Sequence, residues 1–483
     1  MKLINLWVDG YKNLCDTSID FSNDVFPSAV IGNNGTGKSN LLEAILTIFI
    51  KLYFGETPKF RFKINYIAHA KNVEISKNSI EAGCSITVDG AEMGVIRFKE
   101  LAQNPMLRPP FPELIFGYYS GTCKRLTNLF SRYARHYSRK LRENDAGLES
   151  SFIFSDVDQA KFILLALLAN RNFAFLAETS VFSLDHLTIT LQTPKTFDPE
   201  KDDPEFWGAV GAIRLFLADL DYAAINKKRF RNIDRDGTTN RSKERRTYIF
   251  DQTSLEKIGN SARGRGTNVF DMLQVLKMKN ILVSVDFAIV HVDKITQFQF
   301  EELSEGEKQL ISVVGGLHLT NQRECLILLD EPDTHLNPVW TWKYNSLLKN
   351  AINREYENSS TVLITTHNPI MISGLTKDQV LIAHKENGRL TYSNPYRDPR
   401  GQGVANVLTS EFFGLPSSLD EYTQSLMDER LALACKDGKL TALEVLRLGD
   451  INDYLEQLGL TISFRDPQYS EFEKLKYSSQ GNQ

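Results

Sequence analysis

One glycine-rich stretch near the N-terminus has the residue types and the spacing of a phosphate-binding loop. Residues 32–39 match the pattern G-x-x-x-x-G-K-[ST] at every fixed position. Glycines are needed there because a Cβ atom would block the backbone turns and the close approach to a polyphosphate. Lys38 is expected to reach the β- and γ-phosphates, and the Ser39 hydroxyl to bind Mg²⁺. The predicted nucleotide-binding residues of this segment are Asn33, Asn34, Gly35, Thr36, Gly37, Lys38, Ser39 and Asn40.

The residues on either side place this loop between a strand and a helix. Residues 28–31 are mostly apolar, like a short buried strand, and residues 40–46 carry apolar side chains at helical spacing. A helix N-terminus that follows such a loop favours anions through its free N–H groups. A chance match in a glycine-rich turn is the alternative, and the strand and helix on its two sides argue against it.

Two further apolar strands end in polar residues. Residues 324–331 form one that ends in Asp330 and Glu331, and in a parallel sheet these acids would emerge beside the phosphate loop. Asp330 is expected to hold Mg²⁺, while Glu331 would orient and deprotonate the attacking water. Residues 361–366 lead in the same way to His367, which is either a structural histidine or a hydrogen-bond donor to the γ-phosphate. The predicted catalytic residues are therefore Lys38, Glu331 and His367, and the predicted metal ligands are Ser39 and Asp330.

A third motif, residues 303–310, precedes an amphipathic helix. Ser304 and Glu307 have the spacing of a capping box, which would account for both residues structurally. A capped helix N-terminus that Gly306 leaves open is also a phosphate site, and the two interpretations are compatible. We therefore add Ser304 and Gly306 to the predicted nucleotide-binding residues.

The overall composition excludes several classes of protein. The chain has 483 residues, a formal net charge of −4 and 42% hydrophobic residues, so several domains are expected and any nucleic-acid contact needs a local basic patch. Its five cysteines form no C-x-x-C pair, which argues against a zinc ribbon or a disulfide framework and favours a reducing cytosol. The first residues alternate like a strand, and the longest apolar run, near residue 163, is too short to cross a bilayer. A cytoplasmic protein without membrane contact is expected.

The order of these segments suggests a nucleotide-binding head that an insertion divides. Strands are predicted at 3–8, 17–21, 84–88, 94–98 and 113–118, with an antiparallel layer beside a parallel core. Helices are predicted at 157–170 and near 205–217, and strands at 187–192, 281–292 and 297–301. The expected domains are an N-terminal part of the head at 1–120, an inserted helical and basic domain at 121–280, the second part of the head at 281–400, and a helical segment at 401–483.

Two segments of the insertion are rich in cations. The predicted helix 122–143 carries Lys124, Arg125, Arg132, Arg135, Arg139, Lys140 and Arg142 before its first acidic residue, Glu143. Residues 226–246 carry nine cations against three acids and are interpreted as a mobile basic loop. Both segments could bind a nucleic acid or another polyanion, and both could equally be solvated surface.

In order, residues 32–39, 303–307, 330–338 and His367 resemble the motifs of the ATPase head of the ABC superfamily. Glu307 at the fifth position of the signature and the long insertion are similar to the SMC, RecF and OLD branch of that superfamily. The resemblance implies an α/β fold: a P-loop NTPase head of ABC/SMC type with a mixed sheet, an inserted largely helical basic domain and a helical C-terminal segment. Glu305 and His335 depart from the pattern of many transporters, and Gln159 is a weak candidate for the glutamine of a Q-loop.

The tail resembles the Septu-type ATPases of bacterial anti-phage systems, through residues 412–415, 417–420 and 466–467 and Arg430. This resemblance implies a chain that binds and hydrolyses ATP with Mg²⁺ and assembles with a separate HNH nuclease that acts on DNA or another nucleic acid. It also implies a head-to-tail dimer or higher oligomer, in which Ser304 and Gly306 of one copy face the γ-phosphate held by Lys38 of another, with Asp333 at the seam.

Two other functions are compatible with some of these motifs. A DNA-repair or recombination ATPase of the RecF kind, without a dedicated nuclease, would have nearly the same motifs. A transporter's ATPase subunit is opposed by the long basic insertion and by the missing Q-loop glutamine. The chain itself has no H-N-H arrangement, and its tail lacks the acidic strand ends of a Toprim nuclease, so an ATPase that is not itself a nuclease is expected.

Overall fold

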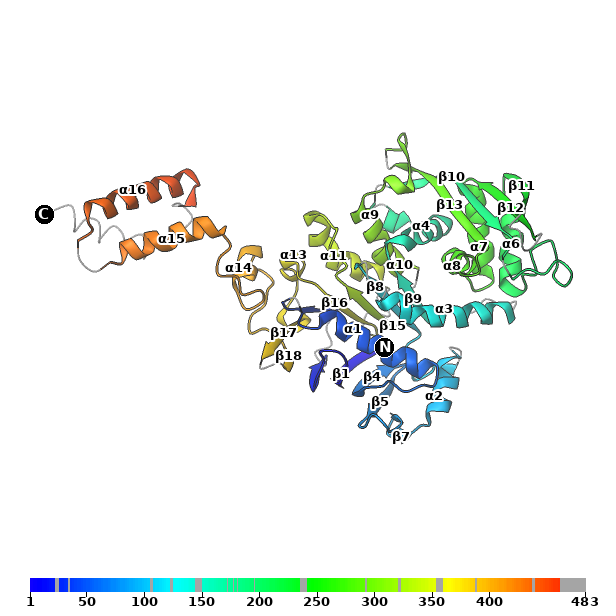
Figure 1. Cartoon of the computed structure of the whole chain (residues 1–483), viewed down its shortest axis with the longest axis horizontal. Helices are drawn as coiled ribbons and strands as arrows, with labels where there is room; N and C mark the ends of the chain where they lie inside the picture. The colour runs from blue at the N-terminus through cyan, green and yellow to red at the C-terminus, as the bar shows by residue number, and fades with distance from the viewer. Residues whose placement is uncertain are drawn as a thin grey trace. The chain divides into compact units, whose positions relative to one another are not determined.

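The computed structural model forms two compact units, residues 1–404 and 405–483, which are considered separately (Figure 1). The described residues are 1–21, 26–33, 35–104, 107–121, 125–143, 150–171, 173–176, 178–179, 181–194, 196–234, 241–291, 293–319, 323–352, 359–386, 389–436 and 439–460. Asn34, Lys124, residues 235–240 and residues 466–467, which belong to predicted sites or segments, lie outside this set.

A mostly parallel sheet forms the centre of the first unit. Its strand order is β18-β17-β3-β16-β15-β8-β9, and only β17 and β18 pair antiparallel. These strands are β3 (Ser28–Ile31), β8 (Leu114–Tyr119), β9 (Phe152–Ser155), β15 (Cys325–Asp330), β16 (Thr361–Thr365), β17 (Val380–Glu386) and β18 (Arg389–Ser393). All six residues of β15 are buried, because a central parallel strand is covered on both faces, and this explains its unbroken apolar run. The predicted α/β head with a mixed sheet is confirmed.

An antiparallel sheet lies beside this core, as predicted. Its strands, in the order β2-β1-β4-β5-β6-β7, are β1 (Lys2–Asp9), β2 (Thr17–Asp20), β4 (Arg61–Ala68), β5 (Lys71–Lys77), β6 (Ser85–Val88) and β7 (Ala91–Glu92). The long helix α1 (Lys38–Tyr53) follows β3 and is buried along most of its length. The strand predicted at 94–98 is wrong: these residues begin α2 (Val95–Ala102), whose buried Phe98 and Ala102 are four residues apart on one helical face.

The inserted segment is mixed rather than largely helical. It contributes β10 (Val181–Gln192), β11 (Asn226–Asp234) and β12 (Arg241–Phe250) to a third, antiparallel sheet of order β11-β12-β10-β13-β14. The remaining strands of this sheet are β13 (Leu282–His291) and β14 (Gln297–Gln299). Strand β9, which the sequence assigned to the insertion, belongs instead to the sheet of the head. The division of the chain into four domains stays a prediction.

The prediction of a mobile loop at 226–246 is wrong for residues 226–234 and 241–246, which lie in the paired strands β11 and β12, while residues 235–240 lie outside the described residues. On β12, buried Tyr248 and Phe250 alternate with the partly exposed Thr247 and Ile249, which is the period of a half-buried strand. The run of cations on β11 concealed this alternation, since a charged side chain on an edge strand need not be buried on either face.

Helices cover the sheets of the first unit, and three of them, α6, α7 and α8, pack against the third sheet (Figure 1). The helix predicted near 205–217 starts later, at Gly211. The helices not yet given are α3 (Arg125–Glu143), η2 (Val157–Gln159), α4 (Ala160–Ala169), α5 (Phe173–Leu176), α6 (Gly211–Ala223), α7 (Gln252–Gly264), α8 (Val269–Met278), η3 (Phe300–Glu302), α9 (Glu305–Leu310), η4 (Ile311–Gly315), α10 (Gly316–His318), α11 (Pro338–Ala351), α13 (Pro369–Ile372) and η5 (Lys377–Gln379).

The second unit is helical, as predicted for this segment. Its helices are α14 (Val404–Thr409), whose first residue ends the first unit, α15 (Glu421–Ala434) and α16 (Ala442–Gln457). Leu426, Ile451 and Leu455 form the small core between α15 and α16. Asp420 caps α15 by accepting a hydrogen bond from the Thr423 N–H, so this residue of the tail motif has a structural role. Among the described residues of the whole chain, no helix is long and apolar enough to cross a membrane.

Candidate nucleotide site

The loop after β3 has the backbone conformation that its glycines predict. Gly37 has a φ of 78°, and a Cβ atom there would lie 2.9 Å from the side chain of Asn13. Gly32 has a φ of 148°, and its Cβ would lie 2.7 Å from the carbonyl oxygen of Ala383. Any side chain at either position would strain the backbone and collide with a neighbour, so the loop requires glycine there. The Thr36 hydroxyl donates to the Asn33 carbonyl at 2.7 Å and closes the turn.

The Lys38 amine lies inside the loop. Its Nζ atom donates to the carbonyl oxygens of Gly32 at 2.6 Å and of Asn33 at 3.3 Å, and the residue is 6% exposed. Burial lowers the pKa of the Lys38 amine, and the carboxylates of Glu331 and Asp330 oppose this effect. A phosphate would replace the two carbonyl contacts with a stronger, charge-assisted partner.

Asp330 and Ser39 meet at the edge where β15, β16 and α1 come together. The Ser39 hydroxyl donates to Asp330 Oδ1 at 3.0 Å, and the Thr365 hydroxyl donates to the same oxygen. Burial raises the pKa of the Asp330 carboxyl, whose residue is 2% exposed, and the two hydroxyl donors act in the opposite direction. One hydroxyl and one carboxylate are hard oxygen ligands of the kind that hold Mg²⁺ together with nucleotide phosphates, so the residues present fit this ion.

Glu331 turns away from the strand line immediately after Asp330. Its φ of 49° is uncommon for a residue with a side chain, and its N–H donates to the Thr365 carbonyl at 2.9 Å. The side chain is 34% exposed, and its Oε1 lies 3.3 Å from Nδ1 of His367, which is 59% exposed. The turn thus directs the carboxylate outward toward the histidine at the end of β16, instead of into the sheet.

The signature residues lie at the start of α9 and not at the phosphate loop of the same chain. Ser304 and Glu307 form the predicted capping box, in which the Glu307 N–H donates to the Ser304 hydroxyl at 3.2 Å. A Cβ on Gly306 would lie 2.8 Å from the His335 carbonyl oxygen, so glycine allows α9 to approach the segment after β15. The two departures from the transporter pattern also meet, since His335 Nδ1 lies 3.4 Å from Glu305 Oε2.

The cavity at the phosphate loop has a volume of about 300 Å³. Its lining residues are Asn13, Gly35, Gly37, Lys38, Ser39, Asn40 and Glu331. The structure therefore brings together the loop residues and Glu331, with Asp330 and His367 in contact with them, whereas Ser304 and Gly306 do not line this cavity.

Two polar residues of the site have no motif that would have identified them. Asn13 donates to the Gly35 carbonyl at 3.1 Å and accepts from the Asn40 side chain at 2.7 Å, so it braces the loop from the turn between β1 and β2. Fully buried Gln309 accepts from the His335 N–H at 2.9 Å and donates to the Glu331 carbonyl at 3.4 Å. Gln309 therefore connects the signature helix with the backbone of the proposed base. In the sequence, Gln309 is only one position of a regular helical pattern, and no motif marks it.

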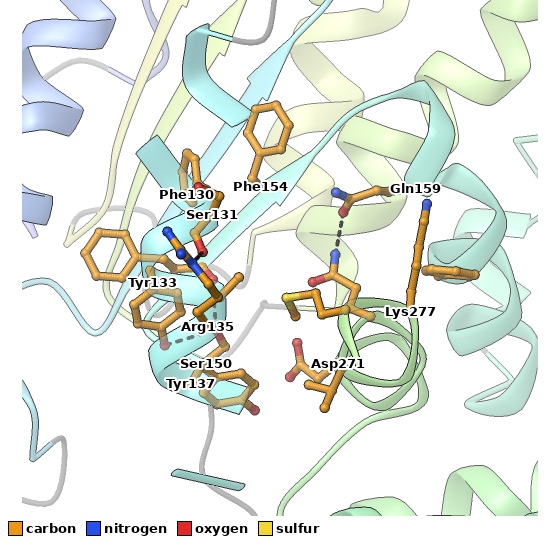
Figure 2. Close-up of a pocket in the computed structure, with 16 residues that line it drawn as sticks. Phe130, Ser131, Tyr133, Arg135, Tyr137, Ser150, Phe154, Gln159, Asp271 and Lys277 are labelled. Carbon is orange, nitrogen blue, oxygen red and sulfur yellow. Dashed lines mark hydrogen bonds between the residues drawn. The ribbon is translucent and has the colours of Figure 1, made fainter. Parts of the chain in front are cut away.

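Asp333 and Gln159 have structural partners in this chain. The Asp333 carboxylate is 4% exposed and accepts from the Thr366 hydroxyl at 2.9 Å, so it points into the protein rather than toward a seam. Gln159 accepts a hydrogen bond from Gln274 and lines a separate cavity of about 480 Å³ between α3, β9 and α8 (Figure 2). Within the described residues its side chain has no hydrogen bond to the phosphate loop, and the structure gives no support to a Q-loop role for it.

Two family models match the parts of the chain that carry these motifs. The model described as "AAA ATPase domain" matches residues 1–100. The model described as "AAA domain, putative AbiEii toxin, Type IV TA system" matches residues 179–373.

Three curated relatives have similar sequences. The Septu protein PtuA of Bacillus mycoides is 28% identical over 174 residues, 34% of this chain and 24% of that protein. The "Retron Vc95 probable ATPase" of Vibrio cholerae is 28% identical over 117 residues, 22% of either chain. The DNA replication and repair protein RecF of Deinococcus deserti is 27% identical over 158 residues, 30% of this chain and 42% of that protein. The chain thus spans less than half the length of each of these relatives.

A solved structure of the SmcHead bound to the C-winged helix domain of ScpA aligns with 82% of this chain and 98% of that chain. The identity is 12% and the TM-score 0.37, and we draw no argument from a likeness of this size. The order of the motifs, the two family models and the three curated relatives support the resemblance of this chain to ATPases of the SMC and RecF kind and to the Septu protein PtuA.

Proposed function

We propose that this chain binds ATP with Mg²⁺ and hydrolyses it to ADP and phosphate. Lys38 and the loop N–H groups would hold the phosphates, and Ser39 and Asp330 would hold the ion, which supplies charge neutralisation at the phosphates. Glu331 would accept the proton of the attacking water, and His367, 3.3 Å from Glu331, would donate to the γ-phosphate. The observation that carries this proposal is the contact of Ser39 with Asp330 beside Lys38, because residues almost 300 positions apart form one phosphate and cation site.

We further propose that hydrolysis requires two copies. Ser304 and Gly306 do not line the phosphate-loop cavity of their own chain, and both lie in the first turn of a helix whose N–H groups favour an anion. A second copy, docked head to tail, would bring these residues to the γ-phosphate held by Lys38. ATP would then act as a link between two copies, and hydrolysis would release them.

The partner and the biological role are proposed from the resemblance. Similarity to the Septu protein PtuA and to a retron ATPase supports an anti-phage role in the cytoplasm, in which docking of the heads regulates a separate HNH nuclease acting on nucleic acid. The similarity to RecF supports a second candidate, a DNA-repair or recombination ATPase without a nuclease partner. Copurification from the native host distinguishes the two: an HNH protein retained with the chain supports the first, and its absence supports the second.

The enzymatic proposal is tested with Glu331→Gln. This variant keeps the shape of the side chain and removes the base, so ATP should still bind while turnover falls by about 10²–10⁴-fold, the usual contribution of general base catalysis. Size-exclusion chromatography with ATP should then show a trapped dimer. Turnover at the wild-type rate would refute the assignment of the base, and a monomer that binds ATP would refute the docking.

A further inference from the structure

The third sheet has one face covered by helices and one open face. Leu187, Ile189 and Leu191 of β10 are buried, and α6, α7 and α8 pack on the sheet. The residues between them, Thr188 and Thr190, are only partly buried. Because directly paired residues point to the same face of a sheet, the strand register identifies every side chain of the open face.

The strand register divides the cations of β11 and β12 into two sets. Lys227 and Arg229 lie opposite Tyr248 and Arg246, both buried, and therefore point toward the helix-covered side. There they pair with Asp221 of α6, with Lys227 Nζ at 2.8 Å and Arg229 Nη2 at 3.7 Å from its carboxylate oxygens. The cations on this side are already matched by acidic or aromatic neighbours.

Arg246 also has a structural role on the helix-covered side of the sheet. It is 3% exposed, its Nε donates to Glu244 at 2.9 Å, and its guanidinium lies 4.4 Å from the ring centroid of Trp207. Arg246 is therefore not available to bind a polyanion without disruption of the packing around it.

Lys228 and Arg245 point to the open face. Arg245 is paired with Phe230 across the two strands, and Lys228 precedes Phe230 by two residues on the same face. All three are exposed, and Phe230 is 55% exposed, which is unusual for a phenylalanine on a flat sheet. Neither cation has an ion pair among the described residues.

Near the two cations, the other side chains of this face whose exposure is described on β10, β11 and β12 are uncharged. They are Asn226, Thr247 and Ile249 on β11 and β12, and Thr188, Thr190 and Gln192 on β10. On β13, Asp286 lies opposite Thr188 and therefore belongs to this face. Strand β10 lies between β13 and the strand of Arg245, so two strand spacings, about 10 Å, separate Asp286 from that strand.

The other basic segment, α3, does not offer a comparable surface. Arg132 contacts Glu56, with its guanidinium 4.2 Å from the ring centroid of Phe54, and Lys140 donates to the Gln103 carbonyl at 3.4 Å. Its described cations therefore serve partly to dock α3 on the head.

We infer that the open face of β11, β12 and β10 binds single-stranded nucleic acid, with a base stacked on Phe230 and phosphates contacted by Lys228 and Arg245. An exposed aromatic ring between cations can stack only on an unpaired base, because the faces of bases in a duplex are already covered. The Lys228–Phe230 distance along the strand, about 6.6 Å for two residues, matches roughly one nucleotide step of an extended strand. The inference rests on the proposed function in taking a nucleic acid as the polyanion.

The test is fluorescence anisotropy of the full chain with labelled oligo-dT and oligo-rU of about 20 nucleotides, longer than the site of a typical single-strand module, and with the same label on a duplex. Phe230→Ala should weaken single-strand binding about 5- to 100-fold, as expected for loss of one base stack. Phe230→Trp should retain it. Phe182→Ala, which removes a 39% exposed phenylalanine from β10 of the same sheet, is the matched control and should change little.

Charge is tested with two matched double variants. Lys228→Gln with Arg245→Gln should make the salt dependence of log K shallower by about 1.4, because each phosphate contact on a single strand contributes about 0.7. Lys227→Gln with Arg229→Gln should leave that slope nearly unchanged, since both cations contact Asp221 on the helix-covered side and point away from the open face. Equal effects of the two pairs, duplex binding as tight as single-strand binding, or absence of binding at low salt would each overturn the inference.

The outcomes also separate this inference from the proposed function. Single-strand binding without ATP turnover would contradict the proposed ATPase function and still support the nucleic-acid surface. ATP turnover without single-strand binding would support the ATPase function and contradict the nucleic-acid surface. A preference for oligo-dT or for oligo-rU decides between DNA and RNA, which this chemistry accepts alike.

Discussion

The substitution Thr365→Val removes one of the two hydroxyl groups that donate a hydrogen bond to Asp330. In the folded protein Asp330 Oδ1 accepts from both Thr365 and Ser39, and it is 2% exposed, so little water can replace a lost donor. A hydrogen bond to a charged, buried acceptor contributes about 1.5–3 kcal/mol. Valine keeps the β-branched shape of threonine and lacks only the hydroxyl. Because that hydrogen bond is lost, Mg²⁺ binding in the nucleotide complex should weaken about ten- to one-hundred-fold.

The same change should alter the pH dependence of activity. Burial already raises the pKa of Asp330, and the Thr365 hydroxyl counteracts this by stabilising the carboxylate. Its removal raises the pKa further, so a larger fraction of the acid is protonated at low pH and cannot bind a cation. The acidic limb of the turnover profile should therefore move to higher pH, and excess Mg²⁺ should restore part of the activity.

The assay measures turnover against Mg²⁺ concentration at several pH values for wild type, Thr365→Val and the matched control Thr366→Val. Thr366 is the next residue, but its hydroxyl donates to Asp333 instead of Asp330. The control should thus keep the wild-type Mg²⁺ requirement. If both variants show the same requirement and the same acidic limb as wild type, the role assigned to Asp330 is wrong.

Three more predictions concern single positions. Lys38→Ala should lower ATP affinity at least tenfold in isothermal titration calorimetry, and unchanged affinity would remove the lysine from the site. Gly306→Ala should cost about 1–3 kcal/mol in urea unfolding, because its Cβ meets the His335 carbonyl at 2.8 Å, whereas Gly264→Ala, with open space around it, should cost nothing. Burial lowers the pKa of His318 to about 4 from its ordinary value of 6.5, so the unfolded chain takes up the proton first and stability should fall as pH drops from 6.5 toward 4. Between pH 7 and pH 5, the free energy of unfolding of His318→Gln should fall by about 2 kcal/mol less than that of the wild type. Parallel curves of unfolding free energy against pH would contradict the burial of His318.

The head shows why local patterns were sufficient for its site. Three of its motifs, after β3, β15 and β16, are short strands followed directly by polar residues, and parallel strands place such ends along one edge of a sheet. The positions of Lys38, Ser39, Asp330 and Glu331 could therefore be predicted from two short segments without knowledge of the packing. Asn13 and Gln309 could not, since each acts through contacts with residues distant in sequence, and a lone asparagine or a helical glutamine carries no local signal.

The segment that differs most from its prediction is the basic one. In the sequence, Lys227, Lys228 and Arg229 are three equivalent consecutive cations in a polar stretch. Pairing of β11 with β12 makes them alternate, so two point to Asp221 and one points to the open face with Phe230. A shift of one residue in the pairing of β11 with β12 would reverse which side chains face outward. Composition could therefore indicate a polyanion site but could not locate it.

The amino-acid sequence by itself determined that this chain carries a phosphate loop, a signature helix and a carboxylate pair of one ATPase type, because glycine conformations and strand-end residues are local properties. Only the tertiary structure decided which residues surround them: the hydroxyls that hold Asp330, the glutamine that joins α9 to Glu331, and the absence of Ser304 and Gly306 from the cavity of their own chain. These depend on how strands and helices distant in sequence pack together, and burial of one side chain against another is not encoded in any single segment.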